Sequence, residues 1–283
     1  MTAGKFSGIR KPGVAGTFYP ANRADIVRLM ETALERERER IDAHAPATAI
    51  AGGVVPHAGI QYCGRHAVHF FELLRRSGQQ HDTVVIAHPN HHGIGPPISV
   101  DGHACWESPL GEVEVDTVLS DALDLPVSAT AQEGEHSAEV MLPWLQHFLP
   151  AGFKIVSVNM LIQDPGTAMQ LAEKLYGVAK RLNHRILFLA SSDFSHFLSP
   201  EEAERRDKAV LDEILRRKLL AAYQAVQRHR VSVCGAGPIM TLMEYARLRD
   251  SNYRVRLLRK GHSGEVSFSD RVVSYVSLLM ESQ

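Results

Sequence analysis

The sequence has 283 residues, of which 45% are hydrophobic and 22% charged, as is typical of a globular chain. Its 31 Lys and Arg residues against 32 Asp and Glu leave a net charge of -1, so no overall positive field favours nucleic acid or an acidic membrane surface as a partner. The N-terminal stretch MTAGKFSGIRKPG lacks the apolar core of a signal peptide, and no run reaches the roughly 18 apolar residues of a membrane span, so we expect a cytoplasmic protein.

Apolar runs rich in β-branched residues alternate with helical patterns along the chain. In chain order the pattern predicts a helix at 23–42, strands at 50–55 and 83–87, helices at 65–76 and 137–149, strands at 153–161 and 185–190, helices at 165–182, 200–228 and 236–248, and late strands at 253–258 and 271–280. Such alternation predicts one α/β domain over residues 1–283, with a central, mainly parallel or mixed sheet flanked by helices. The late strands are expected to add antiparallel pairs, and 97–115 a loop or hairpin that borders the site.

Two histidine motifs lie where predicted strands end. His57 follows the strand at 50–55, and His91 lies in Pro89-Asn-His-His-Gly93 after the strand at 83–87. Ligands of parallel α/β sheets bind at the carboxyl ends of strands, so a metal or a reaction is predicted there. A hydrogen bond to a backbone carbonyl is the alternative for His57. Adjacent side chains point in opposite directions on an extended turn, so only one of His91 and His92 should face the site, while His88 could equally be a hydrogen-bonded core residue.

A third strand end carries an acid and an imidazole, Asp193 and His196. Ser199 and Pro200 have the pattern of a helix start, which leaves Asp193 and His196 free for function rather than capping. His136 and Glu139 have i, i+3 spacing, which places both on one helical face, where they could orient a substrate or simply cap the helix.

Cys234 is predicted to lie in a turn that enters a helix. A thiol at a helix N-terminus has a depressed pKa, which would make the thiolate available for metal binding or nucleophilic attack, although a buried, inert thiol is the alternative. Cys63 and Cys105 have no such setting, and three distant cysteines suit no disulfide framework. The sequence contains no GxSxG or HExxH motif. It also has no GxxxxGK[ST] loop, and Gly235-Ala-Gly237 lacks the third glycine of a dinucleotide loop, so nucleotide binding is not supported.

Six ordered motifs together resemble the Memo family (AmmeMemoRadiSam system protein B-like), from about Arg10 to Met280. They are Val14-Ala-Gly-Thr-Phe-Tyr-Pro20, Pro56-His-Ala-Gly59 with Tyr62-Cys-Gly64, Pro89-Asn-His-His-Gly93, His136-Ser-Ala-Glu139 with Leu142-Pro143, Ser191-Ser-Asp-Phe-Ser-His196 and Cys234-Gly-Ala-Gly-Pro-Ile239.

The resemblance implies a fold like that of the catalytic subunits of class III extradiol ring-cleaving dioxygenases. In that comparison His57 and His91 match the two metal-binding histidines, Cys234 matches the third vestibule residue of the Memo family, and His196 matches the acid/base histidine, with Asp193 in the same motif. The dioxygenases hold Fe(II) with two histidines and a carboxylate, whereas a soft thiolate in the third position shifts the preference toward copper or zinc. His88 and the pair Ile60-Gln61 also depart from the usual family residues.

We therefore expect a metal-dependent oxidoreductase of the non-haem dioxygenase type. His57, His91 and Cys234 would bind the metal, with Fe(II) expected and copper or zinc as alternatives, while His196 transfers protons and Asp193 orients it. A small-molecule or peptide substrate would contact three further residues: His136, Glu139 and His92.

Two other function classes remain open. One is a metal-independent hydrolase in which Cys234 attacks and His57 or His196 is the base. The other is a non-enzymatic peptide-binding or ligand-binding module, as the resemblance implies from the proposed use of eukaryotic Memo proteins toward phosphotyrosine peptides. The resemblance also implies a pathway link to a radical-SAM protein. The oligomeric state is left open.

Overall fold

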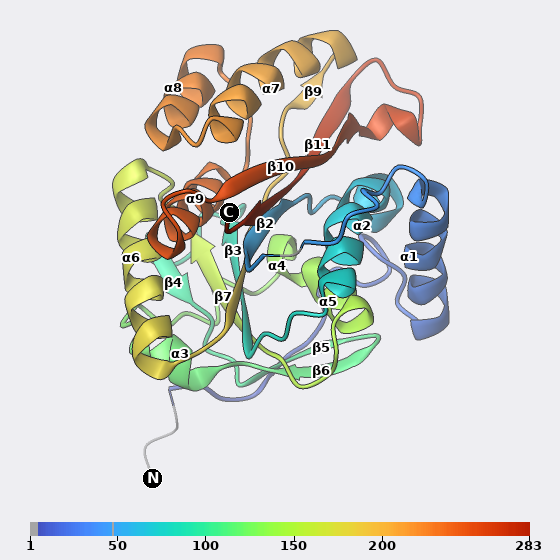
Figure 1. Cartoon of the computed structure of the whole chain (residues 1–283). Coiled ribbons are helices and arrows are strands. Elements are labelled where there is room, and N and C mark those ends of the chain that lie inside the picture. Colours follow the sequence, from blue (N-terminus) through green and yellow to red (C-terminus); the bar gives the residue numbers. More distant parts are fainter. Residues whose placement is uncertain (1–4, 47) are drawn as a thin grey trace.

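Helices and strands alternate through most of the chain, as the hydrophobic pattern predicts (Figure 1). The structure, a computed structural model, describes residues 5–46 and 48–283. The strands are β1 (Ile9–Arg10), β2 (Ile50–Val55), β3 (Thr83–Pro89), β4 (Ile98–Val100), β5 (Cys105–Ser108), β6 (Gly111–Glu114), β7 (Lys154–Met160), β8 (Ile186–Ser191), β9 (His196–Leu198), β10 (Arg254–His262) and β11 (Val272–Glu281). The helices are α1 (Arg23–Glu37), α2 (Ile60–Ser77), α3 (Thr117–Ala122), α4 (His136–Glu139), α5 (Met141–Phe148), α6 (Pro165–Leu182), α7 (Pro200–Leu215), α8 (Leu219–His229), α9 (Ala236–Arg249) and the 3₁₀ turn η1 (Ser263–Glu265).

A mixed sheet forms the centre of the molecule, with the strand order β10-β11-β2-β8-β3-β7-β4 and with β9 paired to β11. The pairs β2/β8, β8/β3 and β3/β7 are parallel, whereas β11/β2, β10/β11 and β4/β7 are antiparallel. A second, three-stranded sheet has the order β1-β5-β6. The predicted α/β class, with a parallel centre and antiparallel late strands, is confirmed.

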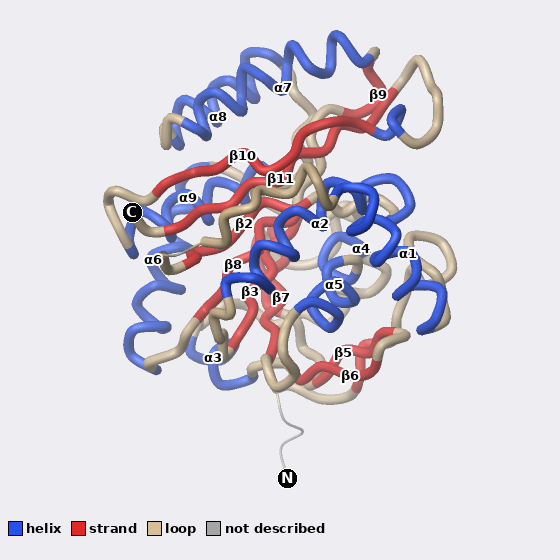
Figure 2. Tube along the Cα trace, turned by 45° about the vertical axis from the view of Figure 1, so that its right-hand side comes forward, coloured by secondary structure: helices blue, strands red, loops and turns tan. Residues whose placement is uncertain are grey.

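Each face of the central sheet is covered by its own layer of helices. Along β3, Val85 and Ala87 belong to one apolar cluster, with α6 and α9, while Val84 and Ile86 belong to a second cluster, with α1, α2 and α5. This is the two-residue period of a strand that is buried on both faces. Figures 1 and 2 show these two layers on opposite sides of the sheet, with α7 and α8 beyond the edge formed by β10 and β11.

Two predicted helices are each divided in the structure. The helix predicted at 137–149 is α4 followed directly by α5, and the helix predicted at 200–228 is α7 and α8, separated where Arg217 adopts the left-handed φ of 61°. The amide of Lys218 then donates to the carbonyl of Glu213, which closes the end of α7. The region predicted as a loop or hairpin at 97–115 contains β4, β5 and β6.

Two further sequence predictions concern the ends of the chain and the membrane. Residues 1–4 of the N-terminal stretch and residue 47 lie outside the described residues, so the assignment of all 283 residues to one domain stays a prediction. None of the helices in the described part has the length and apolar character needed to cross a membrane.

Candidate metal centre

The histidine motifs meet at the carboxyl ends of the parallel strands. Because β2, β8 and β3 are neighbours in the sheet, the residues that follow them are brought together. His57 comes two residues after β2, His91 two residues after β3, and Ser191 is the last residue of β8. The predicted location of the site is therefore the one that the topology produces.

Three imidazoles form the centre of this site: His57, His91 and His136. Each offers one ring nitrogen, and these atoms all lie within 4.8 Å of one another. The rings of His91 and His136 are stacked with their centroids 4.6 Å apart, and His57 meets both edge-on at 5.3 Å. His57 is only 1% exposed, whereas the side chains of His91 and His136 are 30% and 19% exposed. The cluster is therefore reached from the side of His91 and His136.

Ser191 fixes the tautomer of His57. The Ser191 hydroxyl donates to the carbonyl of Ser137 at 2.6 Å, so its oxygen accepts from Nδ1–H of His57 at 2.8 Å. The lone pair of His57 is thereby placed on Nε2. Burial, together with the nearby His136 and His91, holds the pKa of His57 well below its ordinary value. His57 is thus a neutral imidazole that presents an unprotonated Nε2, next to the Cys234 thiol, as its ligand atom.

A buried carboxylate orients His91. Glu135 accepts from Nδ1 of His91 at 2.8 Å and from its backbone amide at 2.7 Å, and it also accepts from the hydroxyl and amide of Ser137. Burial alone would raise the pKa of Glu135, but the His91 hydrogen bond and the charges of His88 and His91 hold that pKa well below its usual range. A carboxylate behind an imidazole is the usual way to present Nε2 to a metal.

His136 belongs to the cluster, although the sequence predicts it as a substrate contact. It is the first residue of α4, and the ring of Phe18 packs against it at a centroid distance of 4.5 Å. Burial is the largest cause that lowers the pKa of His136, to about 4, so this ring is also neutral at neutral pH.

Cys234 lies beside the cluster. Its Sγ is 3.2 Å from Nε2 of His57 and accepts from the amide of Asp193 at 3.2 Å. It falls outside the set of ligand atoms that lie within 4.8 Å of one another, and its role as a metal ligand stays a prediction. The predicted low pKa is wrong, because burial, reinforced by the Asp193 carboxylate, raises the pKa of the thiol well above its ordinary value.

Asp193 and His196 are the predicted catalytic pair, in which Asp193 is expected to orient His196. In the structure the two side chains are hydrogen-bonded to other partners. Asp193 accepts from the backbone amide of His57 at 2.9 Å, and burial raises the pKa of its carboxyl to about 6. The ring of His196 is held instead by Ser232, whose carbonyl accepts from Nδ1–H at 2.9 Å. Nε2 of His196 is left as a proton acceptor, and a proton taken up there would be stabilised by the Asp193 carboxylate.

The predicted substrate contact Glu139 binds the N-terminal segment. Its carboxylate accepts from Arg10 at 2.6 Å, from the hydroxyl of Tyr19 at 2.7 Å and from the amides of Gly13 and Val14. These four hydrogen bonds occupy both oxygens of the Glu139 carboxylate. They also hold the segment at 14–20 beside the site. A role of Glu139 in substrate binding stays a prediction.

The neighbouring histidines have different environments. Nε2 of His92 donates to the carbonyl of Gly134 at 3.1 Å on an exposed turn, so a substrate contact of His92 also stays a prediction. His88 is fully buried and bonds Ser137 and Ser157, which is the hydrogen-bonded core role left open by the sequence.

The donor set suits a transition metal. Neutral imidazoles are ligands for iron, copper, zinc and nickel, and three of them leave coordination positions for a substrate. Two of the three rings have a hydrogen-bond partner on Nδ1, and a thiol lies beside His57. These residues therefore fit the metal site that the sequence predicts, with His136 added to it.

Comparison with known proteins agrees with the motifs. The family model described as Memo-like protein matches residues 10–279. The chain is 36% identical over 281 residues to a MEMO1 family protein of Methanosarcina mazei, with 96% of this chain and 99% of the relative covered. It is 35% identical over 274 residues to a MEMO1 family protein of Archaeoglobus fulgidus, with 96% and 99% covered. A crystal structure of an uncharacterized protein from Escherichia coli K12 is similar with a TM-score of 0.48 and 12% identity, over 74% of this chain and 90% of that one. The chain therefore belongs to the Memo-like protein family.

Proposed function

We propose that this protein is a metal-dependent oxidoreductase of the non-haem dioxygenase type, with Fe(II) as its metal and copper or zinc as alternatives. The observation that carries the proposal is the convergence of His57, His91 and His136, whose ring nitrogens lie within 4.8 Å of one another at the carboxyl edge of the sheet. Three imidazoles would hold the ion, and Cys234 could join as a fourth ligand from beside His57. A bound ion of this kind supplies Lewis acidity and, for iron or copper, electron transfer at the remaining coordination positions.

The protein's own residues have distinct parts in this proposal. Glu135 orients His91, and Ser191 orients His57, so that both rings are fixed before a substrate arrives. His196 would accept a proton from a substrate hydroxyl at Nε2, since its Nδ1–H is already donated to Ser232. Asp193 is a buried carboxylate next to His57. It would stabilise the positive charge that His196 carries after that transfer.

The cysteine-hydrolase alternative is less well supported. A nucleophilic cysteine needs an accessible thiolate, whereas burial raises the pKa of Cys234 well above its ordinary value. On this basis Cys234 should react with iodoacetamide more slowly than a free thiol at neutral pH. A reaction midpoint below the ordinary thiol pKa would favour the hydrolase instead.

The test is the metal content of tag-free protein purified without chelator, measured by elemental mass spectrometry. We expect near-stoichiometric iron or copper in the wild type and a loss in His57→Ala, His91→Ala and His136→Ala. His92→Ala is the matched control, because it removes a neighbouring imidazole that lies outside the cluster, and it should keep its metal.

Activity is tested separately, by anaerobic loading with Fe(II) followed by catechols and measurement of oxygen uptake. Uptake that requires the metal and is lost in His196→Gln would support the proposal. Metal binding without any oxygen uptake over a broad catechol panel would count for a binding module. No metal after loading with Fe(II) or Cu(I) would overturn the metal site itself.

A further inference from the structure

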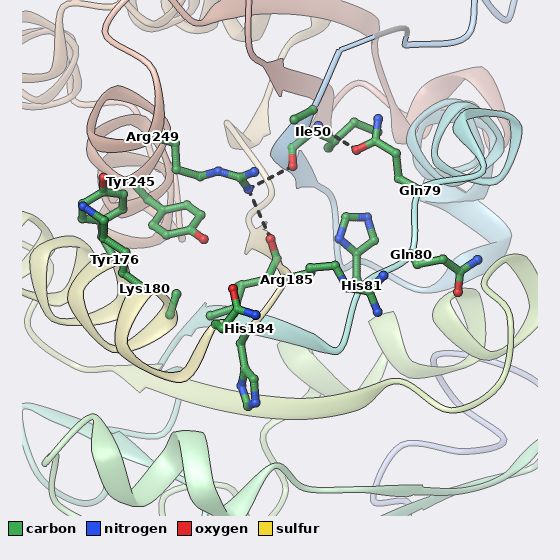
Figure 3. Close-up of a pocket in the computed structure, with 14 residues that line it drawn as sticks. Ile50, Gln79, Gln80, His81, Tyr176, Lys180, His184, Arg185, Tyr245 and Arg249 are labelled. Atoms are coloured by element: carbon green, nitrogen blue, oxygen red, sulfur yellow. Dashed lines mark hydrogen bonds between the residues drawn. The ribbon is translucent and has the colours of Figure 1, made fainter.

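A cavity of about 550 Å³, shown in Figure 3, opens at the amino ends of the central strands. The histidine cluster lies at the opposite, carboxyl ends of these strands. Ile50 and Ile186, the first residues of β2 and β8, lie in its wall, and His81 comes just before β3. Strands of six or seven residues at about 3.3 Å per residue separate the two ends of the sheet by roughly 20 Å. The cavity is therefore distinct from the candidate metal centre, and its size is that of a small-molecule site.

The charged side chains that line the cavity are all basic. They are Lys180, Arg185 and Arg249, and the lining contains no Asp or Glu. Arg185 is neutralised by a close ion pair with Asp82. Lys180 and Arg249 have no carboxylate partner among the described residues, so about two positive charges remain uncompensated in a concave wall, where charge is focused.

Arg249 is held in place by the sheet. Its Nη1 donates to the carbonyls of Ile50 at 3.1 Å and Ile186 at 3.3 Å, which are the start of two neighbouring strands. The guanidinium is therefore positioned before any ligand arrives, and its other donors remain available to a carboxylate or phosphate. Figure 3 shows it between Tyr245 and His81.

His81 has an unused polar atom in the same cavity. Its Nε2 is buried and has no hydrogen-bond partner among the described residues. A buried polar atom of this kind costs free energy unless a partner supplies the bond. Burial lowers the pKa of His81 to about 4, with a smaller effect in the same direction from the nearby Arg249 and Arg185.

Part of the remaining wall is flat and apolar, and the rest carries the uncharged polar side chains of Gln79, Gln80 and Asn183. Tyr176 and Tyr245 line the cavity from α6 and α9, together with aliphatic side chains at the strand starts. Aromatic rings of this kind suit the body of an organic ligand better than a bare inorganic ion.

We propose that this cavity binds a small organic anion. A phosphate or carboxylate group would bind Arg249, Lys180 and Nε2 of His81, and a flat or apolar body would lie against Tyr176 and Tyr245. The site is independent of the proposed metal chemistry.

The test is calorimetric titration of the full chain with three probes that share a phenyl ring: phenyl phosphate, benzoate and neutral benzyl alcohol. At least one anion should bind with a Kd below about 1 mM, and the neutral probe should not. The anion that binds more tightly identifies the head group. Lys180→Gln should weaken binding about tenfold, equivalent to 1.4 kcal/mol. Arg249→Gln should weaken it at least as much.

Two controls separate a built site from general surface charge. Arg181→Gln removes the same charge from the next residue of α6, which does not line the cavity, and should change Kd by less than about twofold. His91→Ala should leave Kd unchanged, because His91 lies at the other end of the sheet. The proposal is overturned if neither anion binds, if benzyl alcohol binds equally well, or if Arg181→Gln weakens binding as much as Lys180→Gln.

Discussion

The orientation of His91 by Glu135 provides a sharp test of the candidate metal centre. Glu135 is buried, and its carboxylate accepts two hydrogen bonds from His91 and two from Ser137. Glu135→Gln keeps the side-chain volume but replaces one acceptor oxygen with an NH₂ donor. That donor would face an N–H or O–H that now donates to the carboxylate, so at least one of these hydrogen bonds is lost.

The structure allows the size of the effect to be estimated. Loss of a partner behind a metal-binding histidine typically lowers metal affinity by about 10- to 100-fold, or about 1.4 to 2.7 kcal/mol. The unpaired donor should also reduce the free energy of unfolding by about 1–3 kcal/mol. The metal effect and the folding effect are separable, because the first is measured on folded protein.

The assay is anaerobic competition for Fe(II) between the protein and a chromophoric chelator, with urea unfolding measured in parallel on metal-free samples. Glu133→Gln is the matched control, since Glu133 lies two residues earlier on an exposed turn and should change neither quantity. A Glu135→Gln protein with wild-type metal affinity would refute the role assigned to this carboxylate, whatever its stability.

Three further predictions concern stability. A Cβ at position 235 would lie 2.3 Å from the carbonyl oxygen of Ser191, so Gly235→Ala should lower the free energy of unfolding by about 2 kcal/mol or more in urea; wild-type stability would contradict this packing. Glu139→Gln leaves the buried Arg10 without its counter-charge and should lower the free energy of unfolding by about 3–5 kcal/mol, measured by thermal unfolding. A decrease of less than about 1 kcal/mol would contradict the importance of this ion pair. His81 has a folded pKa of about 4 against about 6.5 when unfolded, so the unfolded chain takes up the proton first on acidification, and stability is lost as the pH falls through this window. Between about pH 7 and pH 5, the free energy of unfolding should therefore fall by about 2 kcal/mol less in His81→Gln than in the wild type. An equal fall in the two proteins would contradict the assigned pKa.

Much of the fold could be predicted from local pattern. The strand at 50–55 agrees with β2 at both ends, because its apolar run is ended by Pro56 and is buried on both faces. The break between α7 and α8 could not be predicted, since Arg216, Arg217 and Lys218 include neither Gly nor Pro. Residue type does not indicate the left-handed φ of Arg217, which joins two helices that pack against each other.

The metal-binding residues could be predicted only where they come directly after a predicted strand. His57 and His91 satisfy that rule, whereas His136 and Glu135 come from a segment that reaches the site through the tertiary fold. The one signal in the sequence is Glu135, the acid directly before His136, but no local pattern identifies it as the partner of His91, 44 residues away. The pKa of Cys234 depends on burial, which opposes the helix N-terminus and cannot be read from a turn motif.

Whether Cys234 joins the three histidines can be decided by counting protons. The pKa values of His57 and His136 are lowered in the folded protein, so at about pH 8 these rings bind a metal without releasing a proton. The thiol, whose pKa is raised, is protonated at that pH and must release about one proton if it binds as thiolate. Calorimetry of metal binding in two buffers of different ionisation enthalpy gives this number. We expect the wild type to release about one proton more than Cys234→Ser, since ionisation of a bound water would contribute to both. If both proteins release the same number of protons and bind the metal with the same affinity, Cys234 is not a ligand and the histidines alone hold the metal.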